Sequence, residues 1–101
     1  MFGPPEVPTV VATAVDPGSV MLDVREQSEW DDAHVAGSLH IPMGQLVQRL
    51  GEVPTDRPLV VVCHSGHRSG QVTAWLVQQG YEAVNLEGGL VSWAQAGLPL
   101  E

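Results

Sequence analysis

The chemistry of this chain centres on Cys63, its only cysteine. The apolar run 59–62 leads directly into this residue, and a short polar loop with glycines and an arginine follows it. Such a run is typical of a strand that is buried on both faces of a parallel sheet. From residue 69 to residue 79 the apolar positions follow a helical period, and Gly80 is a natural stop after a helix. The predicted order is strand, cysteine loop, helix.

A thiol in this position is expected to be reactive. The first backbone N–H groups of a helix have no partner within the helix, and they favour anions at the preceding loop. These groups and the positive charge of Arg68 should both lower the pKa of Cys63 below the free value of about 8.5. A lone cysteine is often only a small buried hydrophobic residue. A cation so close to the thiol favours a functional role instead.

Four segments of the chain carry a family resemblance. The loop 63–69 reads Cys-His-Ser-Gly-His-Arg-Ser, and residues 23–26 read Asp-Val-Arg-Glu. Residues 34–38 read His-Val-Ala-Gly-Ser, and residues 88–93 read Gly-Gly-Leu-Val-Ser-Trp. Together these segments resemble the motifs of single-domain rhodaneses, which are sulfurtransferases that carry sulfur as a cysteine persulfide.

The resemblance implies an α/β, rhodanese-like fold with a central, mainly parallel sheet of about five strands and helices on both faces. The alternation of strand and helix patterns along the chain predicts the same class of fold. We expect a loose tail over residues 1–8 and one rhodanese-like domain over residues 9–101. In parallel sheets ligands bind beyond the carboxyl ends of the strands, where Cys63 is expected to lie.

The loop is the expected site of sulfur transfer, with Cys63 as the catalytic nucleophile. Backbone N–H groups should form a concave anion site, to which the two serine hydroxyls add donors. The two histidines either assist the thiol or the substrate when charged, or are solvated loop residues. The arginine is expected to shape the loop, hold it to the domain and meet an anionic donor. The implied substrate-binding residues are His64, Ser65, Gly66, His67, Arg68 and Ser69.

Two charged residues follow a neighbouring predicted strand at 20–24. The resemblance implies that Asp23 and Arg25 brace the active-site loop, whereas a plain surface ion pair is the alternative and would contribute little energy. No spacing in the chain resembles a zinc site, so we expect no metal and no cofactor. The tryptophans lie at predicted helical positions and are expected in the core: Trp30, Trp75 and Trp93.

The remaining patterns predict short elements separated by turns. The predicted strands cover residues 9–15, 39–41 and 83–86. The predicted helices cover residues 27–32, with Ser28 as the cap, 43–50 and 90–96.

Composition restricts the partners. The 101 residues are enough for one core, and the formal charge is −8, from 12 acidic residues against four arginines and no lysine. Such a charge argues against nucleic acid or an anionic membrane as a partner. No apolar run is long enough to span a bilayer and no export segment is visible, so a cytoplasmic location is expected, which suits a free thiol.

The sequence therefore predicts a sulfurtransferase that moves sulfur from thiosulfate or another persulfide-type donor to cyanide or a thiol through a Cys63 persulfide. A sulfur-relay or non-catalytic interaction module that acts with a sulfur-accepting protein is the alternative from another class. A cysteine phosphatase is the nearest rival enzyme. Such phosphatases have five residues between the cysteine and the arginine, whereas four separate Cys63 from Arg68. The shorter loop should be too tight for a phosphoryl group.

Overall fold

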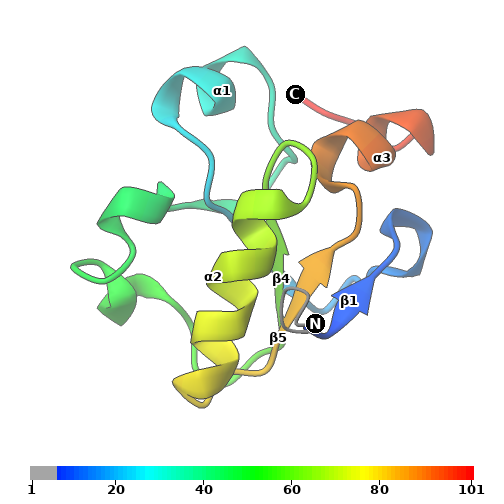
Figure 1. Ribbon diagram of the computed structural model, residues 1–101. Helices are drawn as coiled ribbons and strands as arrows, with labels where there is room; N and C mark the ends of the chain where they lie inside the picture. Colours follow the sequence, from blue (N-terminus) through cyan, green and yellow to red (C-terminus); the bar gives the residue numbers. More distant parts are fainter. Residues whose placement is uncertain (1–6) are drawn as a thin grey trace, which may run out of the picture.

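The sheet of this protein is parallel throughout, with the strand order β1-β5-β4-β2-β3. Figure 1 labels β1, β5 and β4 of this sheet. The computed structural model describes residues 7–101. The prediction of a mainly parallel sheet of about five strands is confirmed. The strands are β1 (Thr9–Val10), β2 (Val20–Asp23), β3 (Leu39–His40), β4 (Leu59–Val62) and β5 (Ala83–Leu86).

Strand β4 is the centre of the sheet, and all of its residues are buried. Its first and third residues lie in a core beneath helix α2 (His67–Gln78), and its second and fourth lie in a core beneath helix α3 (Gly89–Gln95). This alternation follows from the period of two in a strand. The two helices therefore cover opposite faces, as the sequence predicted (Figure 1).

Helix α1 (Gln27–Asp32) follows β2 and covers the predicted range, but its cap differs from the prediction. Glu26 is the N-cap residue, and its backbone N–H donates to the Glu29 carboxylate at 3.0 Å. The prediction that Ser28 caps this helix was therefore wrong. A carboxylate in the third helical position satisfies the first free N–H group better than a serine inside the helix.

The predicted helix over residues 43–50 is not formed. Two short 3-10 helices, η2 (Met43–Gln45) and η3 (Leu50–Glu52), occupy this part of the chain. The apolar spacing was misleading, because Leu46 is buried but Val47 is 73% exposed. A helix whose apolar side chains find no common core has little to stabilise it.

Two longer segments also have boundaries that differ from the prediction. The strand predicted over residues 9–15 ends at Val10, and a 3-10 helix, η1 (Ala12–Ala14), follows. Helix α2 begins at His67, two residues earlier than predicted. The loose tail predicted for residues 1–8 lies outside the described residues except for its last two, of which Pro8 accepts a hydrogen bond from the Asn85 N–H at 2.7 Å. Within residues 7–101, no helix has the length and apolarity required to cross a bilayer.

Candidate active site

Cys63 lies at the carboxyl end of the central strand and directly before the N-terminus of α2, as predicted. Its side chain is buried, with an exposed fraction of 1%. Gly66 is the N-cap of α2 and turns the chain with φ +98°, a conformation that favours glycine. A Cβ atom at this position would also lie 3.2 Å from the backbone nitrogen of Gly88. The tight loop thus aims the start of the helix at the thiol.

Two hydrogen bonds reach the sulfur atom of Cys63. The Gly66 N–H donates to Sγ at 3.1 Å, and the Ser69 hydroxyl lies 3.2 Å from it. Burial raises the pKa of the Cys63 thiol, but the Ser69 hydroxyl and the backbone N–H groups of Ser69, Gly66 and Ser65 together lower this pKa by more. The thiolate is therefore favoured, in the direction that the sequence predicted.

The start of helix α3 holds the outer side of the loop. The N–H groups of Leu90 and Val91 donate to the carbonyls of Cys63 and His64 at 2.9 and 3.1 Å. Gly89 permits this approach, since a Cβ atom there would lie 2.4 Å from the Cys63 carbonyl oxygen. Because α3 occupies these two carbonyls, the loop offers mainly N–H groups to an anion beside the thiol.

Arg68 is paired with a carboxylate of another helix. Its guanidinium donates two hydrogen bonds to Glu29 of α1, at 2.7 and 2.8 Å. The Arg68 guanidinium holds the pKa of Glu29 at about 2, far below its usual range. The same hydrogen bonds raise the pKa of Arg68, and the negative charge of the thiolate contributes a smaller part of that rise.

The pairing corrects one expectation about Arg68. The sequence predicted that its charge would be a main cause of the low thiol pKa, whereas the leading causes that favour the thiolate are the Ser69 hydroxyl and the backbone N–H groups of the loop. Arg68 instead ties the beginning of α2 to α1, in keeping with the expectation that it holds the loop to the domain.

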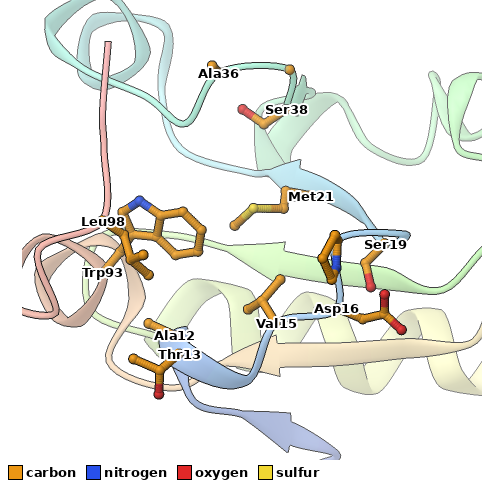
Figure 2. Close-up of a pocket in the computed structure, with 12 residues that line it drawn as sticks. Ala12, Thr13, Val15, Asp16, Ser19, Met21, Ala36, Ser38, Trp93 and Leu98 are labelled. Atoms are coloured by element: carbon orange, nitrogen blue, oxygen red, sulfur yellow. The ribbon is translucent and has the colours of Figure 1, made fainter.

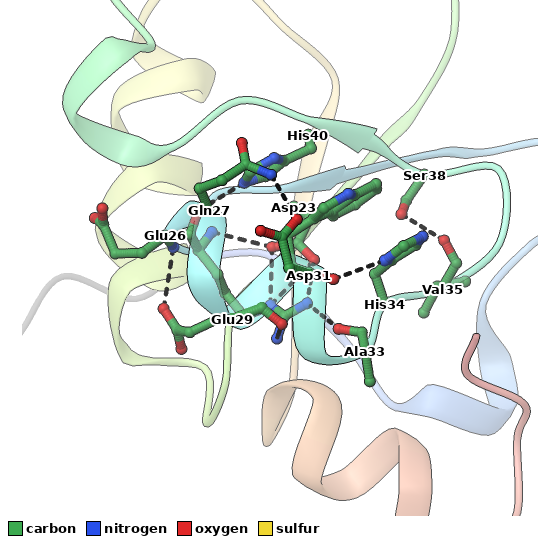
Figure 3. Close-up of polar contacts among 12 residues, drawn as sticks. Asp23, Glu26, Gln27, Glu29, Asp31, Ala33, His34, Val35, Ser38 and His40 are labelled. Atoms are coloured by element: carbon green, nitrogen blue, oxygen red, sulfur yellow. Dashed lines mark hydrogen bonds and ion pairs between the residues drawn. The ribbon is translucent and has the colours of Figure 1, made fainter.

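Asp23 and Arg25 form a buried ion pair at the end of β2, with exposed fractions of 1% and 5%. Arg25 donates to both oxygens of Asp23, and also to the carbonyls of Glu29 at 3.2 Å and Ala33 at 2.7 Å (Figure 3). The alternative of a plain surface ion pair is therefore wrong. The pair fixes α1, and through Glu29 it supports the partner of Arg68.

Asn85 belongs to the same polar cluster, although sequence reasoning treated it only as a strand residue. Its Nδ2 donates to the Gly66 carbonyl at 3.2 Å, and its Oδ1 lies 2.5 Å from the Ser69 hydroxyl oxygen. The available signal was a lone amide in an otherwise apolar strand of a buried sheet. A buried amide is costly unless it is hydrogen-bonded, so it points to a specific polar partner.

The other loop side chains lie on the surface. His64, Ser65 and His67 are exposed, and Ser65 acts on the thiol through its backbone N–H. The loop residues are thus brought together around the sulfur mainly by their main chain.

Trp30 does not lie in either hydrophobic core, contrary to the prediction for all three tryptophans. Its ring stacks on His34, with centroids 3.7 Å apart, and on His40, with centroids 4.6 Å apart. Both imidazoles are fixed by backbone carbonyls, since His34 contacts the Trp30 carbonyl and His40 the Arg25 carbonyl, each at 2.8 Å (Figure 3). Trp93 is buried and Trp75 packs against the α2 core, as predicted.

Two further features of the structure bear on binding. Among residues 7–101, no three His, Cys, Asp or Glu side chains are grouped so as to hold a metal ion. A cavity of about 440 Å³ opens on the α3 side of the sheet, where Val15, Met21, Trp93 and Ser38 line it (Figure 2). None of the predicted site residues lines this cavity.

Comparison with known proteins identifies the family. Residues 8–96 match the family model of the rhodanese-like domain. The chain belongs to the rhodanese-like family. The predicted resemblance is thus confirmed over nearly the whole chain, and the sulfurtransferase motifs quoted above lie within the matched residues.

Relatives of this rhodanese-like chain carry related names. A sulfurtransferase of Allochromatium vinosum is 42% identical over 82 residues, which cover 80% of this chain and 77% of the relative. A thiosulfate sulfurtransferase of Stutzerimonas stutzeri is 34% identical over 89% of this chain and 81% of the relative. A crystal structure of a rhodanese-related protein from Thermoplasma volcanium superimposes with a TM-score of 0.89, at 30% identity over 93% of this chain and 97% of that chain. Fold and family are those of rhodanese-like sulfurtransferases.

Proposed function

We propose that this chain transfers sulfane sulfur from thiosulfate or a small persulfide to a thiol or cyanide, with Cys63 as the sulfur carrier. The observation that carries the proposal is the thiol itself, which is buried at a helix N-terminus with the Gly66 N–H at 3.1 Å and the Ser69 hydroxyl at 3.2 Å from its sulfur. These donors favour a thiolate, which is the form of cysteine that acts as a nucleophile.

The reaction has two displacement steps. In the first, the Cys63 thiolate attacks the outer sulfur of the donor, and the leaving group departs with the electron pair of the broken sulfur–sulfur bond. The product is a persulfide anion. In the second, cyanide or a thiolate attacks the outer sulfur, and Cys63 returns as a thiolate. An anion is present throughout, so N–H groups of the loop, residues 64–69, can stabilise each stage.

Intact-protein mass spectrometry tests this proposal. Incubation with thiosulfate should add the mass of one sulfur atom, and later addition of cyanide should remove it. Cys63→Ser should take up no sulfur, whereas Val47→Ser, which changes a residue that is 73% exposed and lies outside the loop, should still be loaded. Full transfer by Cys63→Ser would refute the assignment of the nucleophile.

A sulfur-relay role is the second candidate, and one relative favours it. A putative sulfur carrier protein of Bacillus subtilis is 36% identical over 72% of this chain, which matches 40% of that protein. A relay would form the same persulfide but discharge slowly to small thiols and quickly to a sulfur-accepting protein. Discharge rates to cyanide and to small thiols separate the two roles, because a transferase turns over repeatedly with small acceptors alone.

A cysteine phosphatase is less consistent with the site. The loop places only four residues between Cys63 and Arg68, and the arginine is engaged by Glu29. We expect no appreciable hydrolysis of an aryl phosphate. Rapid hydrolysis that depends on Cys63 would instead favour the assignment as a cysteine phosphatase. A cytoplasmic location fits a working free thiol and is part of the proposal.

A further inference from the structure

The Ser69 hydroxyl lies between two acceptors. Its oxygen is 3.2 Å from Sγ of Cys63 and 2.5 Å from Oδ1 of Asn85. A hydroxyl has one proton and donates one full hydrogen bond at a time. Ser69, Cys63 and Asn85 are all buried, with exposed fractions of 0%, 1% and 9%. The sulfur and the amide oxygen therefore compete for the same proton.

The amide group of Asn85 has a fixed orientation. Its other end lies 3.2 Å from the Gly66 carbonyl, which can only accept a hydrogen bond. Nδ2 must therefore face Gly66, and Oδ1 must face Ser69. A flipped amide would place two acceptors against each other. Oδ1 is thus a permanent acceptor beside the Ser69 hydroxyl.

The charge on Sγ decides which acceptor receives the proton. When Cys63 is a neutral thiol, its S–H can donate to the Ser69 oxygen, and the hydroxyl donates to Asn85. When Cys63 is a thiolate, the negative charge attracts the hydroxyl, since hydrogen bonds to ionised groups are the stronger ones. Asn85 then loses its donor. In a persulfide the charge lies on the outer sulfur, so the hydroxyl is free to return to Asn85.

We propose that Asn85 is a positioning residue that draws the Ser69 proton away from Sγ whenever this sulfur is uncharged, and that it thereby favours the persulfide over the free thiolate. The inference rests on the proposed sulfur transfer through Cys63. During loading, Sγ forms a bond to the outer donor sulfur, the donor bond breaks and the leaving group keeps its electron pair. One negative charge moves from Sγ to the outer sulfur. No proton is gained or lost, and the Ser69 O–H only rotates.

The first test follows the rate of alkylation by iodoacetamide against pH. Asn85→Ala should lower the thiol pKa by about half a unit to one unit, because the Ser69 proton is then free for the thiolate. Ser69→Ala should raise the pKa. In the Ser69→Ala background, Asn85→Ala should have no further effect. A purely structural role of Asn85 predicts a loosened Gly66 and a raised pKa in both backgrounds, and that result would overturn the proposal.

The second test measures the equilibrium between thiolate and persulfide. Each variant is mixed with thiosulfate and sulfite at a fixed ratio and at a pH well above the thiol pKa, and the loaded fraction is read by intact mass. Asn85→Ala should lower the persulfide-to-thiolate ratio by about threefold to tenfold, which is the same free energy as its pKa shift. If the parent loads normally and Asn85→Ala shows the same persulfide-to-thiolate ratio as the parent, the proposal is contradicted.

The two tests separate this inference from the proposed function. If the parent takes up no sulfur, the sulfurtransferase proposal fails, while the alkylation series still decides whether Ser69 and Asn85 share one proton. If the parent loads but the double-mutant series is additive, the role of Asn85 fails and sulfur transfer stands. Circular dichroism and thermal melting check that each variant folds. Should Asn85→Ala not fold, Asn85→Leu has a similar volume and replaces it in the same series.

Discussion

The pair between Arg68 and Glu29 gives a quantitative prediction about stability. The pKa of Glu29 falls from 4.5 to about 2 in the folded protein. This shift corresponds to about 3 kcal/mol of stabilisation. The side chains of Arg68 and Glu29 are 30% and 31% exposed, so solvent screening reduces the contribution to about 1–2 kcal/mol. Glu29→Gln should lower the free energy of unfolding by this amount at pH 7.

The pH dependence of this effect has a definite sign. The folded-state pKa is depressed, so the stabilisation is complete above the unfolded value of 4.5 and is lost as the pH falls towards about 2. At about pH 3 the unfolded carboxyl is mostly protonated and the folded one is still mostly ionised, which leaves about 40% of the effect. The difference between parent and Glu29→Gln should shrink accordingly.

Urea denaturation at pH 7 and at pH 3 measures both quantities. Glutamine keeps an oxygen that can accept the Glu26 N–H, so the cap of α1 is retained. Glu52→Gln is a matched control, because it removes the carboxylate of an exposed pair with Arg49 and should change stability very little. A Glu29→Gln loss that is equal at both pH values, or that Glu52→Gln reproduces, would refute this account.

Three further outcomes follow from the site. Gly89→Ala should destabilise the protein and slow sulfur loading, because its Cβ would meet the Cys63 carbonyl at 2.4 Å. Gly37→Ala is the control, since Gly37 has a similar positive φ but open space around it, and this variant should lose stability without slower loading. Equal effects of the two variants on loading would contradict the clash. Asp23→Asn leaves Arg25 buried without its counter-charge and should cost about 3–5 kcal/mol in urea denaturation, whereas a loss below about 1 kcal/mol would show that solvent reaches the pair. Arg68→Gln should move the thiol pKa by less than about half a unit in alkylation profiles, and a larger rise would restore Arg68 as a main cause of thiolate formation.

The sequence pointed to the centre of the site and to Asp23 and Arg25 as its supports, but not to Glu29 or Asn85. The run 59–62 predicted a strand that is buried on both faces, because a short, continuous run of such apolar residues is typical of the centre of a parallel sheet, and all four residues are buried in β4. The position of Cys63 followed from this strand and the helix after it. Local patterns were sufficient here, because strand, loop and helix are consecutive in the chain.

The contacts that fix the loop join residues far apart in sequence. Arg68 and Glu29 are 39 residues apart, and Ser69 and Asn85 are 16 apart. No local pattern specifies which carboxylate will pair with an arginine. The charge of Arg68 was therefore expected to act on the anion nearest in sequence, the Cys63 thiolate. The helix predicted at residues 43–50 failed for the related reason that spacing shows which residues share a face but not whether a core lies opposite.

The attachment of the loop to α3 has a consequence for the order in which the protein folds. The carbonyls of Cys63 and His64 are held by residues 90 and 91. The loop around the cysteine is therefore completed only when α3, which lies later in the chain, has docked against it. Contacts of such sequence separation form late in folding, after the costly closure of the intervening chain. The donors to Sγ, the Gly66 N–H and the Ser69 hydroxyl, lie only three and six residues from Cys63, but until α3 docks nothing holds the loop carbonyls in place. The full reactivity of the thiol should therefore appear only when the last helix docks.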